Sequence, residues 1–338
     1  MRKVPKYQQV RDSLLSDIRS GRLGVGAKLP TREELAKQHG VTLTTVEKAL
    51  GDLTARGVLR SVKRLGTFVE NPEPPVRLLV VSEHGQGPVD GEAAVGRNDL
   101  YGLLWALMRG ASGVSVAFMD SAAAGKAPAS FPDFDVVAWL QPSDAQMELA
   151  RQWGRKALVV NRYPPDMSFV STDHRNAMRE LADHLIRQRP ANAQLICLSP
   201  QIEGFVIQER LRGFVDACAA HERFYRIVPV PLGHEPCFRV LSELPLDLSR
   251  ELVMFSPSMS VTGAALRLAA NTQGLALNRN FHYADFDNEF SLERAGVAIP
   301  SAVQDYIAMG AELAKAAKEM VATGSSHRFV PHLLRNLP

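Results

Sequence analysis

The chain has 338 residues, of which 46% are hydrophobic and 22% charged, a composition typical of globular proteins with well-packed cores. No run of about 18 apolar residues occurs, and the N-terminal MRKVPKYQQVRDSLL has no apolar stretch, so neither a membrane span nor a signal peptide is expected. The three cysteines, Cys197, Cys218 and Cys237, lack C-x-x-C spacing, which argues against a zinc site and for a reducing, cytoplasmic location.

The charge is unevenly distributed along the chain. Residues 1–72 hold 14 of the 39 Lys and Arg but only 7 of the 36 Asp and Glu, a net charge of +7. The remainder therefore carries −4, for an overall charge of +3. A small basic head on a mildly acidic body indicates a polyanion as partner of the head.

Three short helices are predicted in the first 57 residues. Apolar residues recur at helical spacing over 7–20, before the glycine-rich GRLGVGAKLP. Thr31 and Glu34 form a T-x-x-E capping box that begins a second helix, which stops at Gly40. Thr42 caps a third helix, whose inward residues are expected to be Val46, Ala49, Leu50 and Leu53.

A short hairpin is expected after the third helix. VLRSVKRLGTFVEN, residues 58–71, alternates and turns, with Lys63 and Arg64 near the tip. Two short helices joined by a tight turn hold the second one where its polar N-terminus can enter a major groove. The hairpin would act as a wing against phosphates or the minor groove.

Residues 1–70 closely resemble the winged helix-turn-helix of the GntR family of bacterial regulators. The motif words occur in order: YQQV, G-x-L-x-x-G-A-K-L-P, TREELA, GVTLTTVEKAL and the wing ending GTFV. The resemblance implies binding to double-stranded operator DNA. The residues expected to contact DNA are Arg32, Thr42, Leu43, Thr44, Thr45, Lys48, Lys63 and Arg64.

The stretch departs from the family pattern at the positions that often hold arginine. Glu33, Leu43 and Glu47 stand there, and Arg64 replaces the first glycine of the wing's G-x-G-T. The operator sequence therefore cannot be carried over from the family.

The proline-rich NPEPP, residues 71–75, is predicted to be a semi-rigid linker. After it, apolar runs alternate with helical segments, a rhythm that predicts parallel sheets covered on both faces. The expected strands are 76–82, 113–119, 134–140, 156–161, 193–199, 225–230, 251–256 and 281–286. The expected helices are 99–110, 144–153, 174–188, 207–221, 261–273 and 304–322.

Residues 76–338 resemble the ligand-binding body shared by LacI-family repressors and periplasmic sugar-binding proteins. The phrases that carry the resemblance are VSTDHRNAMRELADHLI, R-x-x-G-F in ERLRGFVDAC, ADFDN, and IPSAVQDYIAMGAELAKAAKEMV. The resemblance implies an α/β fold with a periplasmic-binding-protein-like body of two lobes, each a doubly wound parallel sheet. We expect one lobe at about 76–162 plus 289–318 and the other at about 163–288 plus 319–338.

Three residues are carried over as effector-binding positions: Asp173, Arg210 and Asp287. Arg210 would bind vicinal hydroxyls or a carboxylate through its planar guanidinium, and the two carboxylates would accept hydrogen bonds from sugar hydroxyls. Alternatively, Arg210 pairs with Glu209 or a neighbouring helix, and the two aspartates cap the helices that follow. Pro257 and Ser258 stand where the family usually has an Asn-Asp pair.

These features predict a ligand-responsive transcription regulator, in the repressor class, that binds operator DNA and senses a sugar-like effector as a homodimer. It is not expected to be an enzyme, and no cofactor, metal site or membrane partner is expected: GQGPVDG fits no phosphate-loop pattern, and no two histidines are spaced i, i+4. Two alternatives stay open. One is a sugar-modifying enzyme with an appended DNA-binding head, and the other is a body that serves only for dimerisation.

Overall fold

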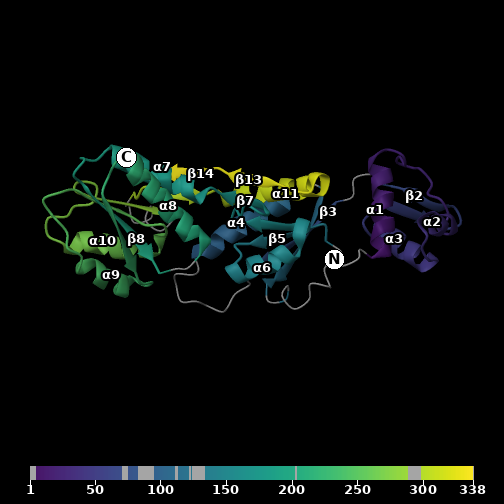
Figure 1. Ribbon diagram of the computed structural model, residues 1–338, viewed down its shortest axis with the longest axis horizontal. Coiled ribbons are helices and arrows are strands. Elements are labelled where there is room, and N and C mark those ends of the chain that lie inside the picture. Colours follow the sequence, from purple (N-terminus) through teal and green to yellow (C-terminus); the bar gives the residue numbers. More distant parts are fainter. Residues whose placement is uncertain are drawn as a thin grey trace. The chain divides into compact units, whose positions relative to one another are not determined.

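The computed structural model describes residues 5–70, 75–82, 95–110, 113–121, 123, 134–201, 204–287 and 298–337. Its contacts divide the chain into two compact units near residue 76. We call residues 5–70 the head and the described residues from 75 onward the body (Figure 1). The linker expected at 71–75 lies, apart from Pro75, outside the described residues.

The head is a three-helix unit followed by a two-stranded hairpin. Its elements are α1 (Lys6–Arg19), α2 (Arg32–His39), α3 (Leu43–Ala55), β1 (Leu59–Val62) and β2 (Gly66–Val69). The strands β1 and β2 pair antiparallel, with Leu59 opposite Val69. The three helices and the hairpin therefore lie where the sequence predicts them.

Local sequence fixes the ends of the short helices of the head. At α2 the capping box is complete: Thr31 accepts from the backbone N–H of Glu34, and the Glu34 carboxylate accepts from the N–H of Thr31 at 2.7 Å. Gly40 ends α2 in the left-handed conformation, with φ 61°. The four residues of α3 predicted to face inward are buried: Val46, Ala49, Leu50 and Leu53. They pack with buried apolar residues of α1 in one hydrophobic core.

The body contains two six-stranded sheets, which define two lobes. Lobe one has the strand order β13-β7-β6-β5-β3-β4, and its paired strands described here are all parallel. The bounds in lobe one are β3 (Val76–Ser82), α4 (Val95–Gly110), β4 (Val114–Asp120), β5 (Val136–Leu140), α6 (Asp144–Gln152), the 3-10 turn η2 (Gly154–Lys156), β6 (Ala157–Val160), β7 (Ser168–Thr172), α11 (Tyr306–Thr323) and β13 (His327–Val330).

Lobe two has the strand order β14-β12-β11-β10-β8-β9, parallel except for the edge strand β14. Its bounds are α7 (His174–Arg187), β8 (Gln194–Pro200), α8 (Phe205–Ala220), β9 (Tyr225–Val230), α9 (His234–Ser242), β10 (Leu252–Phe255), the 3-10 turn η3 (Met259–Val261), α10 (Thr262–Asn271), β11 (Phe281–Phe286), β12 (Ser301–Gln304) and β14 (His332–Arg335).

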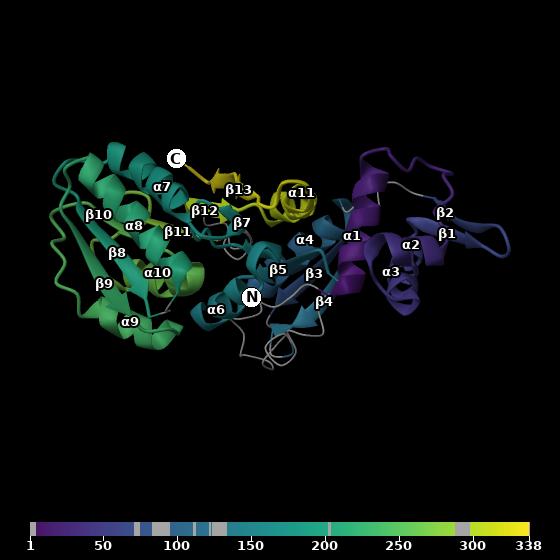
Figure 2. The same ribbon diagram turned by 45° about the vertical axis from the view of Figure 1, so that its right-hand side comes forward.

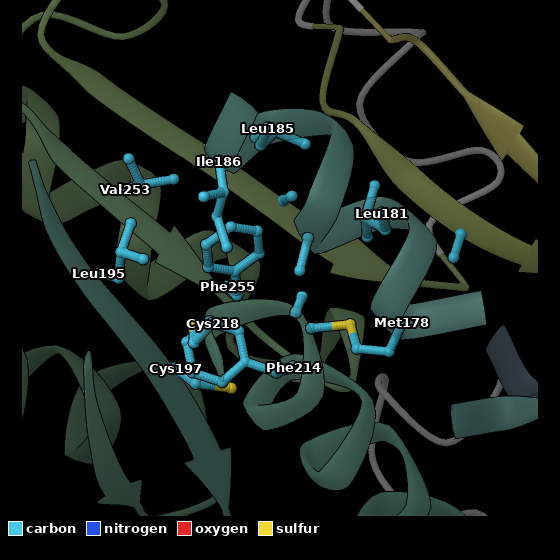
Figure 3. Close-up of a cluster of buried hydrophobic side chains, with 14 of the residues drawn as sticks. Met178, Leu181, Leu185, Ile186, Leu195, Cys197, Phe214, Cys218, Val253 and Phe255 are labelled. Carbon is cyan, nitrogen blue, oxygen red and sulfur yellow. The ribbon is translucent and has the colours of Figure 1, made fainter. Parts of the chain in front are cut away.

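The sheet of lobe two is covered on both faces, as the sequence predicts for parallel strands. Helices α7 and α8 cover one face, and α9 and α10 the other (Figure 2). Figure 3 shows the first of these layers, where apolar side chains of α7 such as Met178 and Leu181 meet Phe214 and Cys218 of α8. These side chains are buried against Phe255 of the central strand β10.

A glycine sets the distance between α7 and α8. A Cβ atom at Gly213 would lie 2.1 Å from the backbone oxygen of Arg175, so the two helices can approach this closely only without a side chain there. The same device recurs in lobe one, where a Cβ at Gly310 of α11 would lie 2.2 Å from the backbone oxygen of Leu103 in α4.

The lobe boundaries expected from the sequence differ from this arrangement. Strands β7 and β13 belong to the sheet of lobe one, and β12 to that of lobe two. The chain therefore changes lobes between β7 and α7, between β12 and α11, and between β13 and β14. Apolar runs in the two lobes have the same pattern, so periodicity does not tell which sheet a strand joins.

No helix in the described part of the chain is long and apolar enough to span a membrane.

Candidate functional site

The N-terminus of α3 exposes three of the eight side chains predicted to contact DNA. Thr42 is the N-cap residue, and its Oγ1 accepts a hydrogen bond from the backbone N–H of Thr45 at 3.4 Å. The hydroxyls of Thr42 and Thr45 also lie 2.9 Å apart. Leu43, 46% exposed, and the exposed Thr44 follow on the first turn. This end of α3 is the part of a recognition helix that reaches base edges first.

Two of the predicted DNA-contacting cations have partners inside the head. Arg32 Nη1 lies 3.1 Å from Glu47 Oε1, and both side chains are more than half exposed. Lys48 Nζ lies 4.3 Å from the centre of the Tyr7 ring. An exposed ion pair contributes about 0–1 kcal/mol, so a phosphate competes readily with Glu47 for Arg32.

Lys63 and Arg64 occupy the turn between β1 and β2, and both are exposed. Arg64 has a φ of 67°, in the left-handed region that favours glycine. This is the position where the family's wing motif has its first glycine, so the backbone conformation is the same type that glycine would adopt. A charged side chain is thereby placed at the tip of the wing at some conformational cost.

The body holds a cavity of about 640 Å³ at the carboxyl ends of strands of both lobes. It is lined by Gln141, Pro142, Ser143, Asp144, Asn161, Arg162, Gly204, Phe205, Val206, Ile207, Arg210, Asp287, Gln304 and Tyr306. Arg210 and Asp287, which the sequence placed in an effector site, are therefore in one cavity wall. A volume of this size is ordinary for a small-molecule site.

Arg210 extends from α8 and is 4% exposed. Its Nη2 donates to Asp287 Oδ2 at 2.8 Å, and its Nη1 donates to the backbone oxygen of Pro257 at 2.8 Å. Its Nε donates to Nδ1 of His174 at 3.4 Å, and the guanidinium lies 3.5 Å from the centre of the Phe286 ring. The guanidinium of Arg210 therefore has three hydrogen-bond partners and one aromatic contact within the protein itself.

Asp287 follows β11 with a φ of 66°, and its carboxylate is shared between Arg210 and Gln304. Asp287 Oδ1 accepts from the backbone N–H of Gln304 at 3.2 Å, and Oδ2 accepts from its Nε2 at 3.0 Å. Gln304 Nε2 also donates to the Tyr306 hydroxyl at 2.7 Å. The remaining Gln304 Oε1 is buried without a partner among the described residues, so the wall holds one unused acceptor.

Asp173 does not line the cavity. It is the N-cap residue of α7, and its Oδ1 accepts from the backbone N–H of Asn176 at 3.0 Å. This is the capping alternative that the sequence left open. Ser258, one of the two departures from the family pattern, likewise caps η3 rather than lining the cavity, whereas Pro257 offers its carbonyl to Arg210.

Seven polar wall residues were not singled out from the sequence: Gln141, Ser143, Asp144, Asn161, Arg162, Gln304 and Tyr306. Each lies at the carboxyl end of a strand or within a few positions after it, in QPSD after β5, in NR after β6, and at and just after the end of β12. Polar residues directly after apolar runs were therefore the available signal. Two of them, Gln141 and Asn161, have positive φ, of 44° and 65°, where the chain turns away from its strand.

Among the described residues, the cavity wall carries two cations and two carboxylates, which form two ion pairs. Arg162 Nη2 lies 2.7 Å from Asp144 Oδ1, and Arg162 Nη1 donates to the backbone oxygen of Pro142 at 2.7 Å. Together with the Arg210–Asp287 pair, this leaves no net charge on the lining residues that the structure describes. Arg162 also stacks 5.1 Å from the centre of the Phe205 ring, which supplies part of the apolar surface.

The Tyr163 hydroxyl, outside the cavity wall, also joins the lobes. Tyr163 lies between β6 and β7 of lobe one, and its hydroxyl donates to Oε2 of Glu209, on α8 of lobe two, at 2.9 Å. Burial and the carboxylate of Glu209 raise the pKa of Tyr163 well above its usual value, so the phenol keeps its proton. The Tyr163 ring also contacts Phe205 edge-on, with centres 4.8 Å apart.

The chain therefore contains two structural units. One is a winged helix-turn-helix head, and the other is a two-lobed body with the fold of periplasmic binding proteins and a cavity at the carboxyl ends of its strands. Residues 6–69 match the family model for "Bacterial regulatory proteins, gntR family". The head is therefore a GntR-family helix-turn-helix domain, and the body has the fold of LacI-family regulators.

Curated relatives match the head. The arabinose metabolism transcriptional repressor of Geobacillus stearothermophilus is 41% identical over 71 residues, which are 21% of this chain and 20% of that protein. The probable fructoselysine utilization operon transcriptional repressor of Escherichia coli is 42% identical over 76 residues, 22% of this chain and 31% of that protein. The match thus spans a fifth to a third of these relatives.

Solved structures match the body, in one case together with residues that precede it. A LacI-family regulatory protein from Chloroflexus aggregans has a TM-score of 0.64 at 15% identity and covers 77% of this chain and 97% of its own. The transcriptional regulator CelR in complex with cellobiose has a TM-score of 0.59 at 19% identity and covers 92% of this chain and 100% of its own. The trehalose repressor from Escherichia coli has a TM-score of 0.58 at 13% identity, over 77% and 99%. At these identities the likeness is one of fold.

Proposed function

We propose that the protein is a ligand-responsive transcription regulator that acts as a repressor in the cytoplasm. The head binds operator DNA through α3 and the wing, and a second copy of the chain brings the second head to the other half-site. The observation that carries the proposal is the joining of a GntR-family DNA-binding domain to a body with a polar cavity of about 640 Å³. Relatives of the head are named as an arabinose metabolism repressor and a probable fructoselysine utilization operon repressor, which supports a sugar-like effector.

The charges of the wall favour an uncharged, polyhydroxylated effector. A carboxylate or phosphate would have to displace Asp287 from Arg210 or Asp144 from Arg162, and both pairs are close, at 2.8 and 2.7 Å. Hydroxyl groups both donate and accept, so they suit a wall on which amides, carboxylates and guanidinium N–H groups alternate. Phe205 and Ile207 offer apolar surface for the C–H face of a sugar ring.

The cavity wall is made from both lobes, so a bound effector contacts both. It would stabilise one arrangement of the lobes over another, in proportion to the difference in its affinity for the two. A change from mostly bound to mostly released operator requires about 5 kcal/mol of such difference. The Tyr163–Glu209 hydrogen bond, which joins the lobes, would contribute to the balance between the two arrangements.

A thermal-shift screen of the full chain tests the ligand class. The neutral panel is L-arabinose, trehalose, cellobiose and fructose, and the charged panel is gluconate and glucose 6-phosphate. At about 100 times its dissociation constant a ligand adds about 2.7 kcal/mol of stability, which is a readable shift. A shift with a neutral sugar that is lost in Arg210→Ala supports the proposal. Binding of the charged panel alone would contradict the neutral class.

Titration with duplex DNA tests the head separately. Binding should weaken steeply as salt rises, because phosphate contacts release counterions. A protein that binds no duplex at any salt concentration would contradict the regulator. Measurable turnover of a bound sugar would favour instead the sugar-modifying enzyme, and DNA binding unaffected by every sugar would favour a body that serves only for dimerisation.

A further inference from the structure

His174 is a wholly buried imidazole between the two sides of the cavity wall. It is the first residue of α7, just after the chain passes from lobe one to lobe two. Its Nδ1 faces Nε of Arg210 at 3.4 Å, and its Nε2 faces Oδ1 of Asn161 at 3.0 Å. Arg210 belongs to lobe two, and Asn161 follows β6 of lobe one, so the ring bridges the lobes.

The partners of the ring determine which nitrogen carries its proton. A guanidinium only donates, so Nδ1 of His174 must accept from Arg210 and cannot carry hydrogen. In the neutral ring the hydrogen then sits on Nε2 and is donated to Oδ1 of Asn161. A second proton on Nδ1 would point at the cation of Arg210. Burial and Arg210 accordingly hold the pKa of His174 well below its usual value.

The tautomer in turn fixes the amide of Asn161. If the amide were flipped, its N–H₂ would face the Nε2–H of His174, donor against donor. Asn161 therefore turns Oδ1 to the ring and leaves Nδ2 as a donor, which makes no hydrogen bond within the described part of the chain. Asn161 lines the cavity and is only 2% exposed, so its Nδ2 is a fixed hydrogen-bond donor in the cavity wall.

The surrounding packing holds the ring rigidly. His174 and Arg210 extend from α7 and α8, whose spacing is set by the bare backbone at Gly213. The Tyr163 ring stacks on His174, with centres 6.3 Å apart and planes inclined by 24°. The Phe286 ring, which contacts the guanidinium of Arg210, is tilted relative to the imidazole, and the two ring centres lie 6.1 Å apart. Neither contact offers the ring another donor or acceptor.

We propose that His174 is a positioning residue of the effector cavity: as an uncharged, Nε2-protonated ring it orients Arg210 and the amide of Asn161, and so selects effectors that present a hydrogen-bond acceptor to Asn161 Nδ2. The ligand arm of the test rests on the proposed function, whereas the tautomer does not depend on it.

The first test is a long-range ¹H–¹⁵N NMR spectrum of the imidazoles in the full chain. One histidine signal should stay in the neutral, Nε2-protonated form from pH 8 to 5.5, and it should vanish in His174→Asn but persist in the matched variant His282→Asn. A His174 signal with hydrogen on Nδ1, or one that titrates near pH 6.5, overturns the proposal whether or not the protein binds DNA or sugar.

The second test measures the affinity of His174 variants for a neutral sugar. It uses whichever of the four sugars of the neutral panel raises the melting temperature of the wild type. His174→Asn keeps an acceptor for Arg210 but loses the donor to Asn161, while His174→Gln keeps a donor that reaches Asn161. We expect about a tenfold loss of affinity in His174→Asn, the worth of one hydrogen bond, and partial recovery in His174→Gln. Unchanged affinity in His174→Asn overturns the proposal. If no panel sugar binds, the NMR result decides it, and DNA titration separately decides the proposed function.

Discussion

The guanidinium of Arg210 and the carboxylate of Asp287 form an ion pair in the cavity wall, with Nη2 and Oδ2 2.8 Å apart across 77 positions of sequence. Arg210 comes from a helix and Asp287 from the end of a strand, and each side chain has further partners: Pro257 and His174 for the arginine, Gln304 for the aspartate. The pair is therefore part of the structure of lobe two as well as of its cavity.

Removal of Arg210 should therefore cost stability before any ligand is added. Arg210→Ala leaves Asp287 with Gln304 alone, and breaking a buried ion pair typically costs about 3–5 kcal/mol. Arg175→Ala is the matched control, because its pair with Asp216 is exposed and should contribute no more than about 1 kcal/mol. Urea unfolding gives both values. Equal costs in the two variants would contradict a structural role for the Arg210–Asp287 pair.

Thr42 and Thr44 are expected to have separable roles at the N-terminus of α3. Thr42→Ala removes the N-cap and should cost the head about 1 kcal/mol, as for other threonine caps. Thr44→Ala removes an exposed hydroxyl that caps nothing, so stability should change by less than about 0.5 kcal/mol while DNA affinity falls. Chemical denaturation and anisotropy titration with duplex DNA measure the two effects. A large loss of stability in Thr44→Ala would refute this division.

Arg64→Gly should weaken DNA binding without weakening the fold. The φ of 67° suits glycine better than arginine, so the free energy of unfolding should stay unchanged or rise by up to about 1 kcal/mol. The lost cation should lower the slope of log affinity against log salt by about 1, as expected for one phosphate contact. Lys63→Ala is the control for charge, with the same loss of slope and no gain in stability. A less stable Arg64→Gly would argue that the side chain of Arg64 supports the wing.

The head could be predicted closely because its signals are local. Capping residues such as Thr31 and Thr42, and the left-handed Gly40, specify helix ends through atoms a few positions away. In the body, strands and helices were predictable where apolar runs are long. The strands β7, β12, β13 and β14 were not expected, because polar residues interrupt them, as in SFVST, SAVQ, HRFV and HLLR, so that no continuous apolar run marks them. The helix α9 was not expected either.

The cavity was only partly predictable for a different reason. Arg210 and Asp287 could be placed in one site from the phrases around them, and they line the same cavity. Asp173 could not be distinguished from a helix cap, since a carboxylate before a helix suits either role. Asn161 and Arg162 enter the wall because β6 ends there, and the end of a strand in space depends on which sheet it joins.

The buried imidazoles should make the protein less stable in mild acid. His174 and His282 both have lowered pKa values, caused first by burial and then by Arg210 and Arg189 respectively. As pH falls below about 6.5, the unfolded chain takes up protons that the folded rings refuse, so stability decreases until the folded pKa values are reached. Each ring contributes up to about 1.4 kcal/mol per pH unit. Urea midpoints between pH 7.5 and 5.5 should therefore fall less steeply in His174→Asn than in the wild type, and an unchanged slope would contradict the assignment.

The close approach of α7 and α8 makes Gly213 the least replaceable glycine of lobe two among those described. Gly213→Ala would place a methyl group 2.1 Å from the backbone oxygen of Arg175 and 3.0 Å from the backbone nitrogen of Arg179, and backbone cannot rotate away as a side chain can. The helices must separate, at a cost of about 1–3 kcal/mol, and His174 must then move relative to Arg210. Gly102→Ala in α4 is the control, because its nearest neighbour would be Cγ1 of Ile307 at 3.9 Å. That variant should gain about 0.5–1 kcal/mol from the better helix former. Thermal and urea unfolding of the two variants should thus move in opposite directions, and a Gly213→Ala protein as stable as the wild type would show that the α7–α8 contact is not the constraint inferred here.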